Sequence, residues 1–453
     1  MSDSIQNVSA VSMTQKATKY RYVILAFIFI LTVVNYADRS ILSLTGTSIA
    51  ADFNISPKDL GIVFSAFGWA YAIGQIPGGW LLDKFGSKKV YCASLMLWSV
   101  CTILQGFVSD SFHLLSVITS FFVLRFVLGL VESPAFPANS RIVATWFPTK
   151  ERGFASSVFN SAQYFATIVF APIMALIISK FSWHYVFVIM GGLGVILSII
   201  WMCTELNPTK QKRINQAELN YIREGGALTD LDQATPITEQ VKDKPSNALI
   251  LKKLFTSRML LGIYIGQYCI TALTYFFITW FPIYLIKGRG MSIMEAGLVA
   301  VIPAVCGFSG GIFGGIISDI MIKRGFSNTV ARKTPFVIGM FLATTLIICN
   351  FTDAQWLIIG LMALAFFGKG LAAVGWAVVS DAAPKEALGL TGGVFNGLGN
   401  IAGIITPLVI GYIVNFTGSF EWALYFVGAH SLLALFSYVI IVGKIKRLEI
   451  KSA

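Results

Sequence analysis

The chain has 453 residues, of which 56% are hydrophobic and 12% are charged, and its mean hydropathy is +0.74. Soluble globular proteins carry roughly 25% charged residues, so this composition excludes a soluble enzyme and indicates a membrane protein. The formal net charge is +12. The basic residues lie between apolar segments rather than on one soluble face, so the charge predicts no nucleic-acid partner.

Twelve apolar stretches follow a polar N-terminal tail, residues 1–19, and each is long enough to cross a bilayer as a helix. They cover approximately residues 20–44, 57–82, 87–107, 112–142, 152–180, 184–204, 257–286, 293–322, 333–351, 355–382, 387–415 and 420–443. We therefore expect an all-α membrane protein with twelve transmembrane helices.

One long hydrophilic stretch, residues 205–254, separates the first six spans from the last six. It predicts a cytoplasmic central loop between two six-helix bundles, residues 20–204 and 255–443, followed by a C-terminal tail, residues 444–453. Within this loop residues 215–224 have a polar start and end at Gly225 and Gly226, which predicts one short amphipathic helix.

The orientation follows from the basic residues. Most of the 34 Lys and Arg lie in the two tails, the central loop and the loops on the same side, so we expect both termini in the cytoplasm. The six Cys are scattered through apolar segments and the three His are far apart in sequence. Neither a metal site nor a bound cofactor is predicted.

The two halves carry the same short motifs. Gly79-Trp-Leu-Leu-Asp83 returns as Gly315-Ile-Ile-Ser-Asp319, 236 positions later, and Val158-Phe-Asn160 returns at the same offset as Val394-Phe-Asn396. Matches at one offset indicate two pseudo-symmetric bundles related by duplication, as in transporters that bind their substrate between two repeats.

The motif after the second span resembles the loop signature of the major facilitator superfamily. It reads Gly79-x-x-x-Asp83-Lys84-x-Gly86. The resemblance implies the twelve-helix fold of that superfamily and a cytoplasmic gate, for which we expect Gly79, Asp83, Lys84, Gly86, Arg141 and Asp319. A basic turn that serves only to orient the chain in the membrane is the alternative interpretation.

Further stretches resemble the anion:cation symporter family, and more narrowly the bacterial D-glucarate/galactarate permeases. They include residues 35–39, 64–71, 74–80, 125–141, 159–166, 264–269, 275–281 and Phe366-Phe-Gly-Lys-Gly370. This resemblance implies proton-coupled uptake of hexarates, which are dicarboxylates, across a bacterial inner membrane. The expected partners are an acidic sugar substrate, protons and the lipid bilayer, and a monomer is expected.

Five ionisable residues stand out well inside the predicted spans: Asp38, Arg39, Arg125, Glu132 and Lys369. Each costs about 2.5–3.5 kcal/mol at the centre of a bilayer, so such residues usually face a cavity or a partner. The spacing of seven between Arg125 and Glu132 places both on one helix face. Arg39, Arg125 and Lys369 are predicted to hold the two ends of a dicarboxylate. The alternatives are internal pairing of Arg39 with Asp38 or Arg125 with Glu132, and snorkelling of Lys369.

Asp38 and Glu132 are the acids that lie well inside spans, and both match family positions, so we assign them to proton coupling. For the substrate hydroxyls, the resemblance implies Tyr36, Tyr71, Gln163, Trp376 and Asn396. Tyr164, Gln267 and Tyr268 are further candidates for the cavity wall. Residue 373 is Ala, and the resemblance implies a difference from galactonate-type relatives at this position, which leaves the selectivity for hydroxyl groups open.

Three other functions compete with hexarate symport. A proton-coupled importer of a monocarboxylate sugar acid, galactonate or a hexuronate, would need less positive charge. A membrane receptor that binds a sugar acid without moving it and an efflux antiporter are the other two. No set of catalytic acid, base and nucleophile lies outside the predicted path, so an enzyme is not expected.

Overall fold

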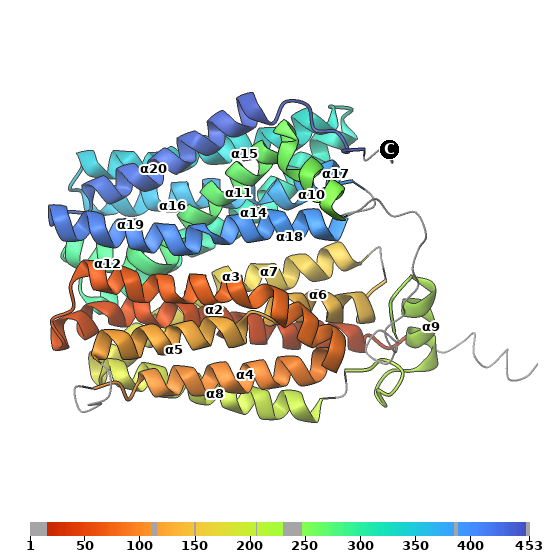
Figure 1. Cartoon of the computed structure of the whole chain (residues 1–453), viewed down its shortest axis with the longest axis horizontal. Helices are drawn as coiled ribbons and strands as arrows, with labels where there is room; N and C mark the ends of the chain where they lie inside the picture. The colour runs from red at the N-terminus through yellow and green to blue at the C-terminus, as the bar shows by residue number, and fades with distance from the viewer. Residues whose placement is uncertain are drawn as a thin grey trace, which may run out of the picture.

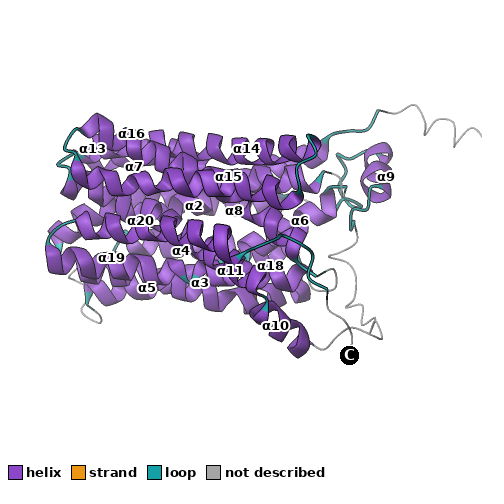
Figure 2. Ribbon diagram, turned by 90° about the horizontal axis from the view of Figure 1, so that it is seen from above, coloured by secondary structure: helices purple, strands orange, loops and turns teal. Residues whose placement is uncertain are grey.

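The computed structural model describes residues 16–109, 116–148, 151–204, 206–229, 247–384 and 388–449. Over these residues the regular structure is entirely helical, and the long helices run side by side along one axis (Figures 1 and 2). The predicted all-α class is confirmed. The short helix α9 (Gln216–Glu224) lies beyond one end of the bundle (Figure 1), which we name the α9 end.

The first half of the chain forms six membrane-length helical segments. Their elements are α2 (Tyr20–Asp52), α3 (Pro57–Phe85), α4 (Ser87–Gln105), α5 (Val117–Glu132) continued by α6 (Ala135–Trp146), α7 (Arg152–Lys180) and α8 (Trp183–Cys203). These elements pack on one another and make up the lower layer of Figure 1.

The second half forms six more segments, which make up the upper layer of Figure 1. After α10 (Asn247–Thr256), the first is α11 (Arg258–Tyr275), η1 (Phe276–Trp280), α12 (Phe281–Ile283) and η2 (Tyr284–Gly288). The others are α13 (Ile293–Val299) with α14 (Val301–Lys323), α15 (Asn328–Ala343) with η3 (Thr344–Phe351), α16 (Gln355–Leu371) with η4 (Ala372–Val374) and α17 (Gly375–Ala382), α18 (Leu388–Asn400) with α19 (Ala402–Thr417), and α20 (Glu421–Phe436) with η6 (Ser437–Ile441).

By length and composition, eleven helices among the described residues are apolar enough to cross a membrane. The predicted span that does not reach this standard is α4, because Lys88 and Lys89 begin it and polar side chains continue along it. It nevertheless packs lengthwise between α5 and α8 inside the bundle.

Local sequence explains where several helices begin and end. Pro57 opens α3, and the Ser56 hydroxyl accepts a hydrogen bond from the backbone N–H of Asp59, which satisfies one of the free donors of the first turn. Gly86 has φ 80° between α3 and α4, and Gly418 has φ 66° after α19. Both take a left-handed backbone conformation that glycine adopts without steric cost.

The two halves pack against each other at the end of the bundle opposite α9. A Cβ at Gly61 of α3 would lie 2.7 Å from the carbonyl oxygen of Pro407 in α19, and one at Gly68 would lie 2.7 Å from backbone atoms of Gly403. In contrast α18, which continues α19 toward the α9 end, barely touches α3. The structure is therefore closed between the halves at the end opposite α9.

The predicted helix of the central loop is confirmed as α9. Asn215 caps it and Gly225 follows its last residue. Its Glu218 is fully buried and accepts hydrogen bonds from the backbone of Tyr20 and from the guanidinium of Arg21, each at about 3 Å. Arg21 also pairs with Glu151. These contacts tie the loop to the first half of the chain.

The close approach of Gly61 predicts a conformational effect of a larger side chain. Gly61→Leu would clash with Pro407, and overpacking of this kind costs about 1–3 kcal/mol. We expect it to open the closed end. A cysteine at Ser43, which lines a cavity between the halves, should then react faster with an impermeant maleimide added from the side opposite α9.

The matched control is Gly192→Leu, because nothing lies within 4 Å of a Cβ at Gly192. An unchanged labelling rate for the Gly61 variant would contradict the closed arrangement described here.

Candidate functional site

Two helices that carry ionisable residues are interrupted beside them. Ser133 and Pro134 separate α5, which ends at Glu132, from α6. The 3-10 turn η4 begins three residues after Lys369. Ser133 and Lys369 correspond under the 236-residue repeat, so both halves interrupt the equivalent helix near the equivalent position. Interrupted helices at the middle of a membrane protein are typical of transporter binding sites.

The strongest charge interaction in the site is an ion pair between α2 and α5. The guanidinium of Arg39 donates a hydrogen bond from Nε to one carboxylate oxygen of Glu132, and one of its terminal nitrogens forms an ion pair with the same oxygen. The Arg39 guanidinium also lies 4.8 Å from the ring centroid of Tyr36 and 4.7 Å from that of Tyr71. Tyr36 and Tyr71, both predicted to bind substrate hydroxyls, therefore lie against Arg39. Arg39 is predicted to bind a substrate carboxylate, but in this structure it is already paired with Glu132.

Arg125 and Asp38 are buried beside this pair. Arg125 and Glu132 share the buried face of α5, as their spacing predicts. One terminal nitrogen of Arg125 donates to the backbone oxygen of Arg39 at 3.2 Å, but its Nε and other terminal nitrogen have no hydrogen-bond partner. Neither oxygen of Asp38 accepts a hydrogen bond of ordinary geometry, although Asp38 interacts electrostatically with Arg125 and Glu132.

Lys369 provides a second cationic centre, in the other half. Its side chain is 4% exposed, and its Nζ lies 3.5 Å from the Gln163 side-chain oxygen and 3.5 Å from the Tyr164 hydroxyl. The rings of Tyr164 and Phe366 lie 5.1 and 5.0 Å away. Among the described residues no carboxylate forms an ion pair with it, which is an unusual state for a buried ammonium group.

A small enclosed cavity lies next to Lys369, between the halves. Its walls include Ser43 of α2, Gln163 and Tyr164 of α7, Thr274 of α11 and Phe366 of α16. The volume of about 40 Å³ holds a few water molecules but no sugar acid. A substrate near Lys369 therefore requires the halves to move relative to this arrangement.

The remaining predicted hydroxyl ligands lie in the second half. Gln267 lies against Gly399, and its amide nitrogen donates to Thr271 at 3.4 Å. Trp376 is 48% exposed and packs on Phe395, next to the half-buried Asn396. Tyr268 instead packs against His430 of α20, with 5.6 Å between ring centroids. The structure does not bring Tyr268 together with the charged residues.

Two further residues reach the charged cluster although sequence reasoning did not select them. Tyr275, from the second half, interacts electrostatically with Arg39, Glu132 and Arg125 of the first half. Asn35 is buried one turn before Arg39, and both of its side-chain polar atoms lack partners. The sequence feature that could have indicated Asn35 is a polar amide inside an apolar span, four residues before Arg39.

The predicted gate residues lie toward the α9 end. Lys84 stands over the Trp80 ring at 4.7 Å, Gly86 links α3 to α4, and a Cβ at Gly79 would meet open space. Arg141 lies in α6, and the Asp83 side chain lies outside the described residues. Asp319 lies 3.5 Å from Arg332, which also contacts Asp381 at 3.0 Å. Gate function remains a prediction.

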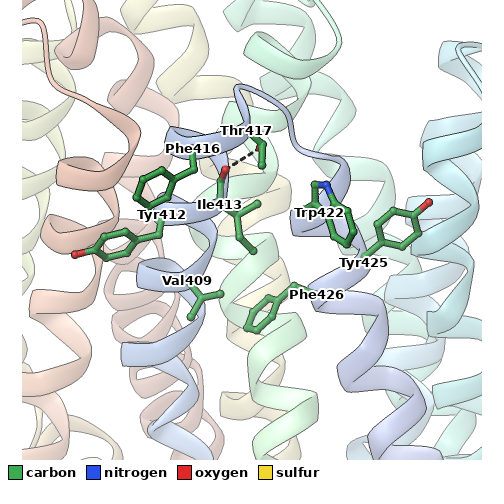
Figure 3. Close-up of a pocket in the computed structure, with 8 residues that line it drawn as sticks. All are labelled: Val409, Tyr412, Ile413, Phe416, Thr417, Trp422, Tyr425 and Phe426. Carbon is green, nitrogen blue, oxygen red and sulfur yellow. Dashed lines mark hydrogen bonds between the residues drawn. The ribbon is translucent and has the colours of Figure 1, made fainter.

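A separate groove lies between α19 and α20 (Figure 3). Its lining is aromatic and aliphatic and carries no charged side chain: Val409, Tyr412, Ile413, Phe416, Thr417, Trp422, Tyr425 and Phe426. Phe416 and Trp422 are exposed. The groove has none of the cations that a sugar acid needs, and we do not assign it to the substrate.

Two repeated helical bundles with buried charges at interrupted helices define a membrane transporter. The model of the Major Facilitator Superfamily matches residues 28–331 and 325–451, and the chain belongs to this superfamily. It is a multi-pass membrane transporter and not an enzyme.

Several curated relatives match nearly the whole chain. The chain is 55% identical to the "Probable galactarate/D-glucarate transporter GudP" of Escherichia coli strain K12, over 98% of each chain. It is 40% identical to the "D-galactonate transporter" of Escherichia coli O6:H1, over 95% of this chain and 98% of that one. The solved structure of a "D-xylose-proton symporter" has a TM-score of 0.68 at 16% identity, covering 94% of this chain and 99% of that one, and supports the fold.

Proposed function

We propose that this protein is a proton-coupled symporter that imports hexarate dicarboxylates, D-glucarate and galactarate, by alternating access. The similarity to relatives named as galactarate/D-glucarate transporters supports the substrate class. The location is a bacterial inner membrane and the working unit is a monomer within the lipid bilayer. The α9 end is cytoplasmic, because most Lys and Arg of the tails and loops belong to it.

The observation that carries this proposal is the unpaired buried Lys369. The first half supplies Arg125 with free guanidinium donors, and the second half supplies an ammonium group without a carboxylate partner. A molecule with a carboxylate at each end would neutralise both centres at once. Arg125 would bind one carboxylate through its planar fork, and Lys369 would attract the other as a compact charge.

Charge balance within the spans favours coupling to a proton. The buried ionisable residues of the candidate site comprise three cations, Arg39, Arg125 and Lys369, and the two acids Asp38 and Glu132. With both acids ionised, this group has one surplus positive charge. A hexarate adds two negative charges, so one proton on an acid makes the occupied site neutral. Charge left over at low dielectric is costly.

The Arg39–Glu132 ion pair suggests which step the structure represents. When Glu132 is ionised, its carboxylate forms an ion pair with the Arg39 guanidinium, which is then not free to bind substrate. Protonation of Glu132 would weaken this pair and free Arg39 for substrate. Deprotonation on the cytoplasmic side would restore the pair and displace the substrate. The closed end opposite α9 is then periplasmic, and the structure corresponds to a substrate-free stage in which the Arg39–Glu132 pair has formed.

Monocarboxylate transport is the second candidate, and the 40% identity to a D-galactonate transporter favours it. A single carboxylate would need Arg125 but not Lys369. The two candidates therefore differ in what they predict for Lys369.

We expect Lys369→Met to weaken D-glucarate transport selectively. Methionine has a similar length and removes a buried unpaired charge, so folding should be kept. Loss of one charged hydrogen bond costs about 1.5–3 kcal/mol, or roughly a ten- to hundredfold rise in KM. The measurement is uptake of labelled D-glucarate into proteoliposomes, with galactonate and glucuronate as competitors. Lys369→Arg is the charge-retaining control, and an unchanged KM in Lys369→Met would favour the monocarboxylate function.

We expect Glu132→Gln to abolish accumulation driven by an inward proton gradient while leaving exchange of substrate across the membrane. Glutamine keeps the shape and removes the titrating group. Glu421→Gln, a carboxylate of α20 at the opposite end, is the control. Gradient-driven accumulation that survived in Glu132→Gln would remove this residue from the coupling mechanism.

The direction of transport, and whether substrate crosses the membrane at all, distinguish a symporter from a receptor and from an antiporter. Wild-type protein should accumulate hexarate when the outside is acidic and lose this ability with a protonophore. Binding without uptake would indicate a receptor, and outward substrate flux driven by inward proton flow would indicate an antiporter.

A further inference from the structure

A stripe of polar side chains runs along one face of α4. Trp98, Thr102 and Gln105 follow at intervals of four and three residues, which places them on the same face of the helix. All three are buried, and each has a polar atom without a hydrogen-bond partner: the indole N–H, the hydroxyl and the amide oxygen. Native proteins leave few such groups unsatisfied.

This stripe faces the acids rather than the neighbouring helix α8. The Trp98 indole nitrogen lies near Asp38, although the two make no hydrogen bond of ordinary geometry. The α8 side of α4 is occupied by Ser99, which packs on Gly194 and donates to the backbone oxygen of Leu95. The unsatisfied groups are thus confined to the side of α4 that holds the predicted proton-coupling site.

Water is the ligand that these groups require. Each buried polar atom left without a partner costs about 1–3 kcal/mol, and internal waters usually satisfy such atoms with two to four hydrogen bonds each. Carboxylates inside membrane spans mark proton relays in pumps and transporters, and the carboxylate of Asp38 lies beside this row.

The acids have no direct access to solvent in this state. Glu132 is 0% exposed and Asp38 is 1% exposed, and the halves are closed at the end opposite α9. Toward the α9 end, the inside of the first bundle is filled mainly by apolar side chains, including Ile24, Leu25, Ile28 and Leu31, and the polar atom without a hydrogen-bond partner on the same face of α4 there is the hydroxyl of the fully buried Tyr91. Toward the opposite end, the stripe continues to Gln105, the last residue of α4, two positions before the exposed Phe107.

We propose that the α4 stripe, Trp98, Thr102 and Gln105, is a water-filled route by which Asp38 takes up protons from the periplasmic end, separate from the path of the substrate. This inference rests on the proposed proton coupling. The charged groups that face Asp38 are Arg125 and Glu132, both from α5. Arg39, its neighbour on α2, is held by Glu132.

The transfer conserves atoms and charge along the row. A proton from periplasmic water enters the first water beside Gln105, and each water passes on one of its own protons. The Thr102 hydroxyl can accept and donate in the same way, while the Gln105 oxygen and the Trp98 N–H hold waters in place. The last water forms an O–H bond on Asp38, and no other reactant is needed.

The test compares proton influx with substrate exchange in the same proteoliposomes. A trapped pH dye reports proton influx during D-glucarate uptake, and counterflow of labelled D-glucarate at equal pH reports substrate movement without net proton flow. Thr102→Val and Gln105→Leu remove the polar atoms at similar volume. We expect each to slow coupled proton influx about tenfold, less than the roughly 10²–10⁴-fold contribution of a positioned acid or base, because neighbouring waters still bridge part of the route. Counterflow should stay within about twofold of wild type.

Ser99→Ala, on the other face of α4, is the matched control and should change neither rate. Normal proton influx in both stripe variants would overturn the route, and so would parallel loss of counterflow, because the side chains would then be needed only for structure. Absence of coupled proton influx in the wild-type protein would instead refute the proposed coupling itself.

Discussion

The neutralisation of buried charge is the constraint on which the site depends. A bilayer offers no solvent to the five ionisable side chains inside the spans, so each must find a partner, water or substrate. Arg39 and Glu132 satisfy this by pairing between α2 and α5. That pair joins two helices of one half. Arg125 and Asp38 lie beside it, since Arg125 donates to the backbone oxygen of Arg39 and Asp38 interacts electrostatically with Glu132.

Much of this arrangement could be predicted because it follows from local patterns. Hydropathy marked the helices, and the repeat of Asp83 at Asp319 indicated the two halves. The seven-residue spacing placed Arg125 and Glu132 on one face, and the polar start and glycine stop located α9. Each of these features depends on residues close in sequence or on a fixed helical period.

The pairing partners could not be predicted, because they depend on how helices distant in sequence are packed. Asp38 adjoins Arg39 in the chain, yet Arg39 pairs with Glu132, 93 residues away. Tyr268 and Gln267 are neighbours in sequence, but the helix directs the first toward α20 and the second toward α18. Tyr275 reaches the opposite half from the end of α11, where the π-helical turn η1 begins. No periodicity in the sequence indicates such a contact.

The unequal pairing of the cations gives the proposed cycle its physical basis. A site in which every charge had an internal partner would bind no substrate, because a carboxylate could enter only by displacing another. Here Arg39 has a partner that protonation can remove, Arg125 has free donors, and Lys369 has only neutral neighbours, Gln163 and Tyr164. A monocarboxylate would neutralise the surplus charge without any proton, whereas a dicarboxylate exceeds it by one negative charge. For a neutral occupied site, a hexarate therefore needs one more bound proton than a monocarboxylate does.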